Sequence, residues 1–148
     1  MKNIILIIFC SLVMTSAGLP EFNKTSNVAN LEGVWELEHQ FMYENNEVSD
    51  TIFNPNGYRQ IKMFSKGKVM WTRFDPADGN EWFGYGSYTV KDNTLEEFLE
   101  YASDPMMKII DTTEVFRFEL QISKDHFRQI DLNKDGTFCH SENYKRIE

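Results

Sequence analysis

The feature that most constrains the fold is a long stretch of alternating residues at positions 31–43. Successive side chains of a β-strand point to opposite faces of a sheet, so this alternation predicts a strand with one apolar face and one acidic, solvated face. The stretch spans thirteen residues, about twice the length of a typical strand. A strand this long suits a sheet that curls and closes on itself. The residues predicted to share the apolar face are Leu31, Gly33, Trp35, Leu37, His39, Phe41 and Tyr43.

Shorter runs with strand character follow along the chain, separated by turn-forming Gly, Asn, Asp and Pro residues. Residues 45–57 are rich in these turn formers and are predicted to be a loop. Residues 94–102 also fit a helical spacing, but the neighbouring hairpins favour a strand. The predicted fold class is all-β, an eight-stranded antiparallel up-and-down barrel. The predicted strands are 31–43, 58–65, 68–75, 81–91, 94–102, 112–122, 126–132 and 137–147.

The first residues of the chain have the pattern of a secretory signal peptide. Lys2 precedes an apolar run at 4–14, and the small residue Ala17 suits a cleavage site. The eleven residues of this run are too few to cross a bilayer. We therefore expect a signal peptide at 1–17, a flexible lead-in at 18–30 and a barrel domain at 31–148. The protein is expected to be secreted or periplasmic, with no membrane insertion after signal cleavage.

The net charge argues against one class of partner, and the cysteine content excludes an internal disulfide as a source of stability. The chain has 15 Lys and Arg against 23 Asp and Glu, a formal net charge of −8. An acidic protein is repelled by phosphate backbones, so nucleic acid is not an expected partner. After signal cleavage only Cys139 remains, which permits no internal disulfide. The fold must therefore be held together by its hydrophobic core.

The sequence Gly33-Val34-Trp35 in the first strand, together with Arg146 in the last, resembles the lipocalin pattern. The resemblance is closest to lipocalin-like domains of secreted bacterial proteins with no assigned activity, and it extends over residues 86–97 and 142–147. It implies that the tryptophan closes one end of the barrel and that the arginine packs across its indole. Gly33, Trp35 and Arg146 would then be structural positions.

No catalytic motif and no metal-ligand spacing of histidines is present in the sequence, so neither an enzyme nor a cofactor is expected. We expect a small apolar molecule to bind inside the barrel. Tyr144 and Arg146 could hold a ligand carboxylate, although an Arg146 that only covers Trp35 and pairs with Glu142 is favoured. The candidate wall residues, assigned from strand parity, are Trp71, Trp82, Tyr88, Phe116 and Phe118. The alternative is a structural or interaction module whose barrel is filled by its own aromatic side chains; its protein partner is not indicated.

Residues 131–142 match the calcium loop of an EF-hand, D-x-[DN]-x-[DN]-G-x₅-E. Carboxylate, amide and carbonyl oxygens would form the coordination shell. Only six residues follow the final glutamate, which leaves little room for the exit helix. A β-hairpin with an Asn-Lys-Asp-Gly turn is therefore favoured, and calcium binding remains a second alternative. Its ligands would be Asp131, Asn133, Asp135, Thr137 and Glu142.

Overall fold

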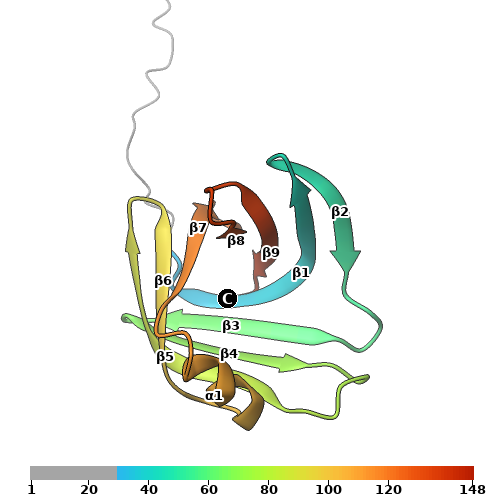
Figure 1. Cartoon of the computed structure of the whole chain (residues 1–148). Coiled ribbons are helices and arrows are strands. Elements are labelled where there is room, and N and C mark those ends of the chain that lie inside the picture. Colours follow the sequence, from blue (N-terminus) through green and yellow to red (C-terminus); the bar gives the residue numbers. More distant parts are fainter. Residues whose placement is uncertain (1–29) are drawn as a thin grey trace, which may run out of the picture.

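The computed structural model describes residues 30–148, so the predicted signal peptide and nearly all of the predicted lead-in lie outside the described residues. The described chain is almost entirely β-structure with one short helix (Figure 1). The elements are β1 (Gly33–Glu44), β2 (Glu47–Phe53), β3 (Arg59–Ser65), β4 (Lys68–Phe74), β5 (Trp82–Lys91), β6 (Thr94–Ala102), α1 (Asp104–Ile110), β7 (Phe116–Ile122), β8 (His126–Leu132) and β9 (Phe138–Arg146). Within residues 30–148 there is no helix with the length and apolar character needed to cross a bilayer.

The strands form one antiparallel sheet that closes into a ring. Its order is β2-β1-β3-β4-β5-β6-β7-β8-β9, and an additional pairing of β1 with β9 closes eight of these strands into the ring. The ninth, β2, pairs with the second half of β1 and lies outside the ring. Figure 1 shows β1 curving along β3 and then rising into its hairpin with β2. The predicted eight-stranded antiparallel barrel is confirmed, and residues 94–102 are a strand.

Two elements differ from the sequence prediction. Residues 47–53, predicted as loop, form β2, whose side chains are mostly exposed. Asn45 and Asn46 both have positive φ, as a two-residue hairpin turn requires, and Asn tolerates that conformation. The second difference is α1, which begins where Pro105 was expected only to break a strand. Proline suits the first turn of a helix because that turn needs no backbone N–H donor there.

A β-bulge in β1 reverses the faces predicted for its second half. The pairing with β9 shifts register between Leu37 and His39, so one extra residue is accommodated at Glu38. Trp35 and Leu37 point into the barrel, but the aromatic residues that follow lie on the outer side of the sheet. The prediction that one apolar face runs the whole length of 31–43 is therefore wrong. The outer aromatic row consists of His39, Phe41, Tyr43, Phe53 and Phe138.

One end of the barrel is closed by a packed apolar core. Trp35 is fully buried, and its ring lies edge-on to Phe127 with centroids 4.9 Å apart. Phe127 in turn stacks on Tyr144 at 4.6 Å. Fully burying an aliphatic or aromatic side chain contributes about 1.5–3 kcal/mol, so this cluster is a major source of stability. The remaining members of the cluster are Leu31, Leu37, Phe64, Val69, Leu95 and Leu120.

Arg146 covers this closed end from outside. Its guanidinium carbon lies 3.9 Å from the centre of the Trp35 ring, a cation–π arrangement, and its nitrogens donate to the backbone carbonyls of Lys124, Glu32 and Asn30. Gly33 has a φ of +130°, and a Cβ there would lie 2.5 Å from an Arg146 nitrogen. The glycine therefore leaves the space that the arginine occupies.

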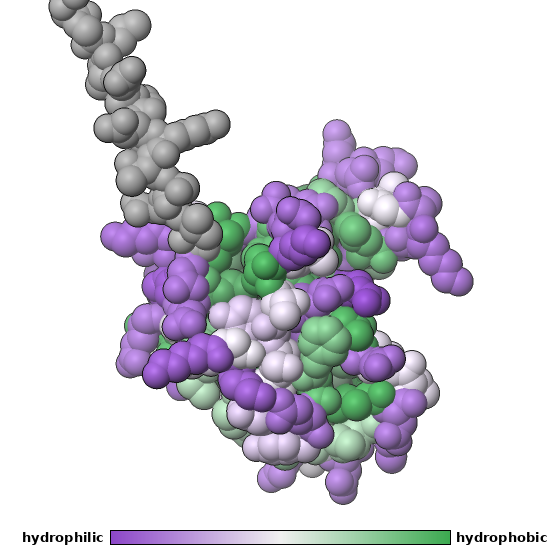
Figure 2. Space-filling view, turned by 90° about the vertical axis from the view of Figure 1, so that its left-hand side faces the viewer, coloured by the Kyte–Doolittle hydropathy of each residue, from purple (hydrophilic) through white to green (hydrophobic). Residues whose placement is uncertain are grey.

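The outer surface is mixed in character. Figure 2, which faces the left-hand side of Figure 1, shows hydrophobic patches interrupted by hydrophilic residues. Ion pairs lie across neighbouring strands on the outside, such as Arg117 with Glu96 at 2.7 Å. An exposed pair of this kind contributes little stability, typically less than about 1 kcal/mol. Other charged groups, such as Lys62 and Glu97, are buried inside the barrel.

Candidate functional site

A cavity of about 280 Å³ lies inside the barrel, beyond the closed-end core. Side chains from β3, β4 and β6–β9 form its wall, and Met106 of α1 contributes from the connection between β6 and β7. The lining mixes apolar side chains with charged and amide side chains. The lining residues are Gln60, Lys62, Trp71, Arg73, Glu97, Leu99, Met106, Phe116, Phe118, Gln129, Asp131, His140 and Glu142.

A glycine on β5 makes room for the largest side chain of the wall. Gly84 pairs with Trp71 of β4, and a Cβ at Gly84 would lie 2.8 Å from the indole nitrogen and 3.1 Å from Leu99 Cδ1. The indole and the leucine therefore both approach the bare backbone of β5. A glycine within a strand often marks such a close approach. The aromatic wall of the cavity depends on this glycine.

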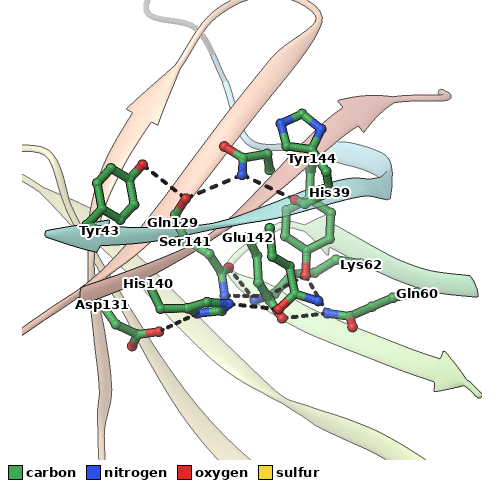
Figure 3. A network of polar contacts seen from close by, with 12 residues as sticks. His39, Tyr43, Gln60, Lys62, Gln129, Asp131, His140, Ser141, Glu142 and Tyr144 are labelled. Carbon is green, nitrogen blue, oxygen red and sulfur yellow. Dashed lines mark hydrogen bonds and ion pairs between the residues drawn. The ribbon is translucent and has the colours of Figure 1, made fainter. Parts of the chain in front are cut away.

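The floor of the cavity contains a buried ion pair. Lys62 Nζ lies 2.6 Å from Glu97 Oε1, and the two side chains are only 3% and 4% exposed. The ammonium also donates a hydrogen bond of 2.7 Å to Gln129 Oε1 (Figure 3). It lies 5.6 Å from the centre of the Phe118 ring. A buried charge must be paired and hydrogen-bonded to be tolerated. Lys62 meets both conditions.

Glu142 of β9 is the centre of a second set of hydrogen bonds in the same layer. Its Oε1 accepts from Gln60 Nε2 at 3.0 Å, and its Oε2 accepts from Gln129 Nε2 at 2.8 Å and from Tyr144 OH at 2.7 Å. Figure 3 shows these side chains converging on the carboxylate from three strands. All three donors are neutral groups. We call Gln60, Lys62, Glu97, Gln129 and Glu142 the polar layer.

Burial changes the protonation behaviour of groups in and beside the polar layer. The pKa of Glu97 is raised, chiefly because burial disfavours the charged carboxylate, while the neighbouring Lys62 opposes this change. Burial and the nearby Glu142 raise the pKa of the Tyr144 phenol well above its usual value. Burial likewise raises the pKa of Tyr58 to about 12. Both phenols therefore stay protonated and serve as hydrogen-bond donors at neutral pH.

Arg73 reaches the cavity from the far end of β4. Its guanidinium carbon lies 4.4 Å from the centre of the Trp82 ring, and one nitrogen lies 3.9 Å from Asp78. The Trp82 indole nitrogen donates to the same carboxylate at 2.7 Å. The Nε atom of Arg73 is buried and finds no hydrogen-bond partner within residues 30–148. The guanidinium is thus held by an aromatic ring and a carboxylate at the edge of the cavity.

His140 lines the cavity between a carboxylate and an amide. Its Nδ1 lies 3.3 Å from Asp131 Oδ2, and its Nε2 lies 2.7 Å from Gln40 Oε1. The hydrogen bond with Asp131 raises the pKa of the imidazole above its usual value. Cross-strand pairing brings these residues together. His140 lies directly opposite Asp131 on β8, and Gln40 on β1 lies opposite Glu142, two residues from His140 on β9.

The structure brings three of the predicted wall residues to the cavity: Trp71, Phe116 and Phe118. Tyr88 instead packs in the closed end, 4.8 Å from the Phe64 ring, and Trp82 stacks beside Arg73. Tyr144 and Arg146, the two residues considered for binding a ligand carboxylate, do not line the cavity. Tyr144 is buried in the core with only its hydroxyl directed at the polar layer.

Arg146 lies on the outer side of Trp35, where backbone carbonyls occupy its donors. Tyr144 and Arg146 are therefore not brought together at this cavity, and neither of them lines it. The expected pairing of Arg146 with Glu142 is also not formed, because that carboxylate is bound by Gln60, Gln129 and Tyr144. The basic groups that line the cavity are Lys62, Arg73 and His140 instead.

The calcium motif folds as the β8–β9 hairpin, not as a loop between helices. Asp135 accepts hydrogen bonds from the backbone and hydroxyl of Thr137 in the turn, while Glu142 points into the barrel. Asn133 donates to Thr137 and Asp131 contacts His140. Among the described residues, no group of three or more acidic, His or Cys side chains is placed to hold a metal ion.

Sequence reasoning missed the polar layer. On β3 the polar Gln60 and Lys62 point inward together with Phe64, whereas the apolar Met63 is 38% exposed on the outside. One signal was present: Glu97 lies between Leu95 and Leu99 on the inward face of its strand. A charged residue on an apolar face is a candidate for a buried pair or a binding site.

No family model matches the chain, and no curated protein matches its sequence. Solved structures do share its architecture. A lipocalin-like protein from Bacteroides uniformis ATCC 8492 aligns with a TM-score of 0.53 and 16% sequence identity, covering 79% of this chain and 98% of that chain. An uncharacterized protein from Bacteroides eggerthii DSM 20697 aligns with a TM-score of 0.51 and 16% identity, covering 79% and 99% of the two chains. The chain therefore has a lipocalin-like fold.

Proposed function

We propose that the protein binds a small amphipathic molecule in the cavity of its barrel. The lipocalin-like fold supports a ligand-binding barrel, because a barrel of this kind encloses a concave site within a rigid wall. The volume of about 280 Å³ is close to the lower end of the range of about 300–1,000 Å³ for small-molecule sites. The ligand is therefore expected to be small.

The observation that carries this proposal is the two-part lining of the cavity. An apolar wall, made by Trp71, Leu99, Met106, Phe116 and Phe118, surrounds most of the space. The polar layer forms its floor and contains a buried ion pair and a hydrogen-bonded carboxylate. The sequence alone suggested a small apolar molecule. The polar layer favours a ligand that also carries a polar head.

The two parts of the lining would contribute differently to binding. Removing apolar ligand surface from water contributes about 25 cal/mol per Å², and this term would come from the apolar wall. The polar layer would fix the orientation of the ligand, because a polar group buried there must find hydrogen-bond partners. Binding and release are the whole mechanism proposed; no chemical step is assigned to the site.

The place of action is also part of this proposal. The pattern of residues 1–17 is that of a secretory signal peptide, and it supports a function outside the cytoplasm. A barrel without disulfides, such as this one, would rely on its apolar closed end for stability after export.

A second candidate function is protein interaction through the edge strand β2. Within residues 30–148 this strand has no partner on its outer side, and it exposes Val48, Ile52 and Phe53. Phe53 is 73% exposed and belongs to the outer aromatic row. An exposed edge strand can pair with another chain. Binding through β2 would make the protein an interaction module. The barrel filled by its own aromatic side chains, which the sequence offered as part of that alternative, is not observed, because the interior contains a cavity.

Native mass spectrometry of the exported protein tests the binding function. We expect an organic mass that is lost on denaturation. Leu99→Trp should prevent its binding by filling the cavity, whereas Tyr101→Trp adds the same side chain to an exposed position of the same strand and should bind normally. A ligand retained equally by both variants would contradict binding in the cavity.

A further inference from the structure

The charges of the polar layer do not cancel. It contains one ammonium, on Lys62, and two carboxylates, on Glu97 and Glu142. Lys62 and Glu97 form a pair at 2.6 Å, which leaves the second carboxylate without a cation among its bonded partners. Glu142 accepts hydrogen bonds from the neutral donors of Gln60, Gln129 and Tyr144, and its charge also acts on the nearby His140, which is hydrogen-bonded to Asp131. An ionised carboxylate removed from water is costly unless a positive charge or several donors compensate it.

An acceptor atom is also left open in this layer. Glu97 Oε1 is buried and lies 2.6 Å from Lys62 Nζ, and within residues 30–148 no other group donates to it, so one of its lone pairs has no donor. Glu97 lines the cavity, and its side chain is only 4% exposed. A hydrogen-bond donor that enters from the cavity would stabilise this buried oxygen.

The basic groups at the edge of the cavity each lie beside a carboxylate of their own, although the buried Nε of Arg73 has no hydrogen-bond partner within residues 30–148. Arg73 is 31% exposed, stacks on Trp82 and lies beside Asp78. His140 lies beside Asp131. Each of these cationic or titratable groups therefore has its own carboxylate, whereas the excess negative charge lies in the buried floor.

We propose that the polar head of the ligand is a basic amine, bound as an ammonium by Glu142 and Glu97. This inference rests on the proposed function, and it names the class of ligand. The ammonium supplies both a positive charge and several N–H donors, which match the excess charge and the open acceptor. The apolar body of the ligand then lies against Trp71, Phe116 and Phe118.

Three probes of equal chain length test this proposal by isothermal titration calorimetry: 1-octylamine, 1-octanol and octanoate. They share one apolar body, so differences in affinity report on the head group. We expect the amine to bind at least about tenfold more tightly than the alcohol, a ratio that corresponds to one charge-assisted hydrogen bond. Octanoate should bind most weakly because it adds a negative charge to an already negative floor.

Two variants locate the effect. Glu142→Gln should lower the affinity for 1-octylamine about tenfold and leave the affinity for 1-octanol nearly unchanged. Glu100→Gln makes the same chemical change on the outer surface, where Glu100 pairs with Lys68, and should alter neither affinity. A thermal melt of each variant verifies that it is folded.

The outcomes separate this inference from the function on which it rests. If 1-octanol binds in the cavity and 1-octylamine binds no more tightly, the barrel binds ligands but the amine is the wrong head group. If octanoate binds best, Arg73 rather than Glu142 selects the ligand, and the inference is overturned. If none of the three probes binds, both the inference and the proposed binding of amphipathic molecules fail.

Discussion

The two halves of this barrel are built from the same strands but on different principles. In the closed end, Trp35, Phe127 and Tyr144 pack in direct contact, and Arg146 covers them. In the other half, the inward positions of the same strands hold Lys62, Glu97 and a cavity. Close packing gives stability, whereas a buried ion pair is weak evidence for it. The comparison indicates that the closed end holds the fold, and the proposed function assigns ligand binding to the cavity half.

The largest expected effect comes from the closed end. Trp35→Ala removes the central ring of the packed cluster and should lower the free energy of unfolding by about 3–5 kcal/mol. Trp82→Ala is the matched control, because that ring stacks on Arg73 at the edge of the cavity and is only partly buried. Urea denaturation of both variants measures the difference. Equal losses of stability would contradict the division into two halves.

The buried ion pair should show the opposite balance between stability and binding. Lys62→Met leaves Glu97 buried without its cation and should cost about 3–5 kcal/mol of unfolding free energy. The double variant Lys62→Met/Glu97→Met replaces the pair with apolar side chains and should recover most of that loss.

The double variant should also bind amphipathic ligands less tightly, because Lys62 and Glu97 no longer supply polar groups to the floor of the cavity. Urea denaturation and calorimetry with 1-octylamine measure the two properties on the same protein. A double variant that is as unstable as Lys62→Met would show that the ion pair itself stabilises the fold. That result would contradict the expectation that the pair contributes to binding more than to stability.

A smaller effect is expected from pH at the edge of the cavity. The pKa of His140 is raised in the folded protein, so protonation favours folding. This contribution is fully present below the unfolded pKa of about 6.5, and it is lost as the pH rises through the higher folded pKa. Its size should be no more than about 1 kcal/mol, because Asp131 is half exposed and screened by solvent.

Thermal melts between about pH 5 and about pH 8 measure this dependence. Asp131→Asn should remove most of it, since the hydrogen bond with Asp131 is the main cause of the raised pKa of His140. If the wild-type protein and Asp131→Asn lose stability in parallel as the pH rises, His140 is not the group responsible for the pH dependence.

The smallest effect is expected from calcium. Glu142 points into the barrel and Asp135 is engaged by Thr137, so the β8–β9 turn lacks the coordination shell that its sequence suggested. Neither calcium nor a chelator should change the melting temperature. A calcium-dependent rise in melting temperature that disappears in Asp135→Ala would contradict this description of the hairpin.

Much of the fold could be predicted because its strands alternate in the expected way. Trp35 and the strand at 94–102 followed from local patterns and from the regular succession of turns. The bulge at Glu38 could not be predicted, because an extra residue in a strand leaves no mark in a short alternating sequence. β2 was missed because its mostly exposed, polar residues resemble a loop.

The candidate site was harder to predict than the fold. Trp71, Phe116 and Phe118 were found because aromatic residues at inward positions are the ordinary signal of a wall. The residues of the floor break the rule that apolar side chains point inward, as Lys62 and Met63 on β3 show. Phe64 on the same face of β3 is buried in the closed-end core, so Lys62 also points inward, where its pairing with Glu97 makes the burial tolerable.

The most direct measurement is a two-dimensional ¹H–¹⁵N NMR titration of the indole N–H signals. The chain has three tryptophans, and two of them report on the two halves of the barrel: Trp71 lines the cavity, and Trp35 lies in the closed end. On addition of 1-octylamine, we predict a saturable shift of the Trp71 signal and an almost unchanged Trp35 signal. A Trp71 signal that does not move, or that moves no more than the Trp35 signal, would contradict ligand binding in the cavity.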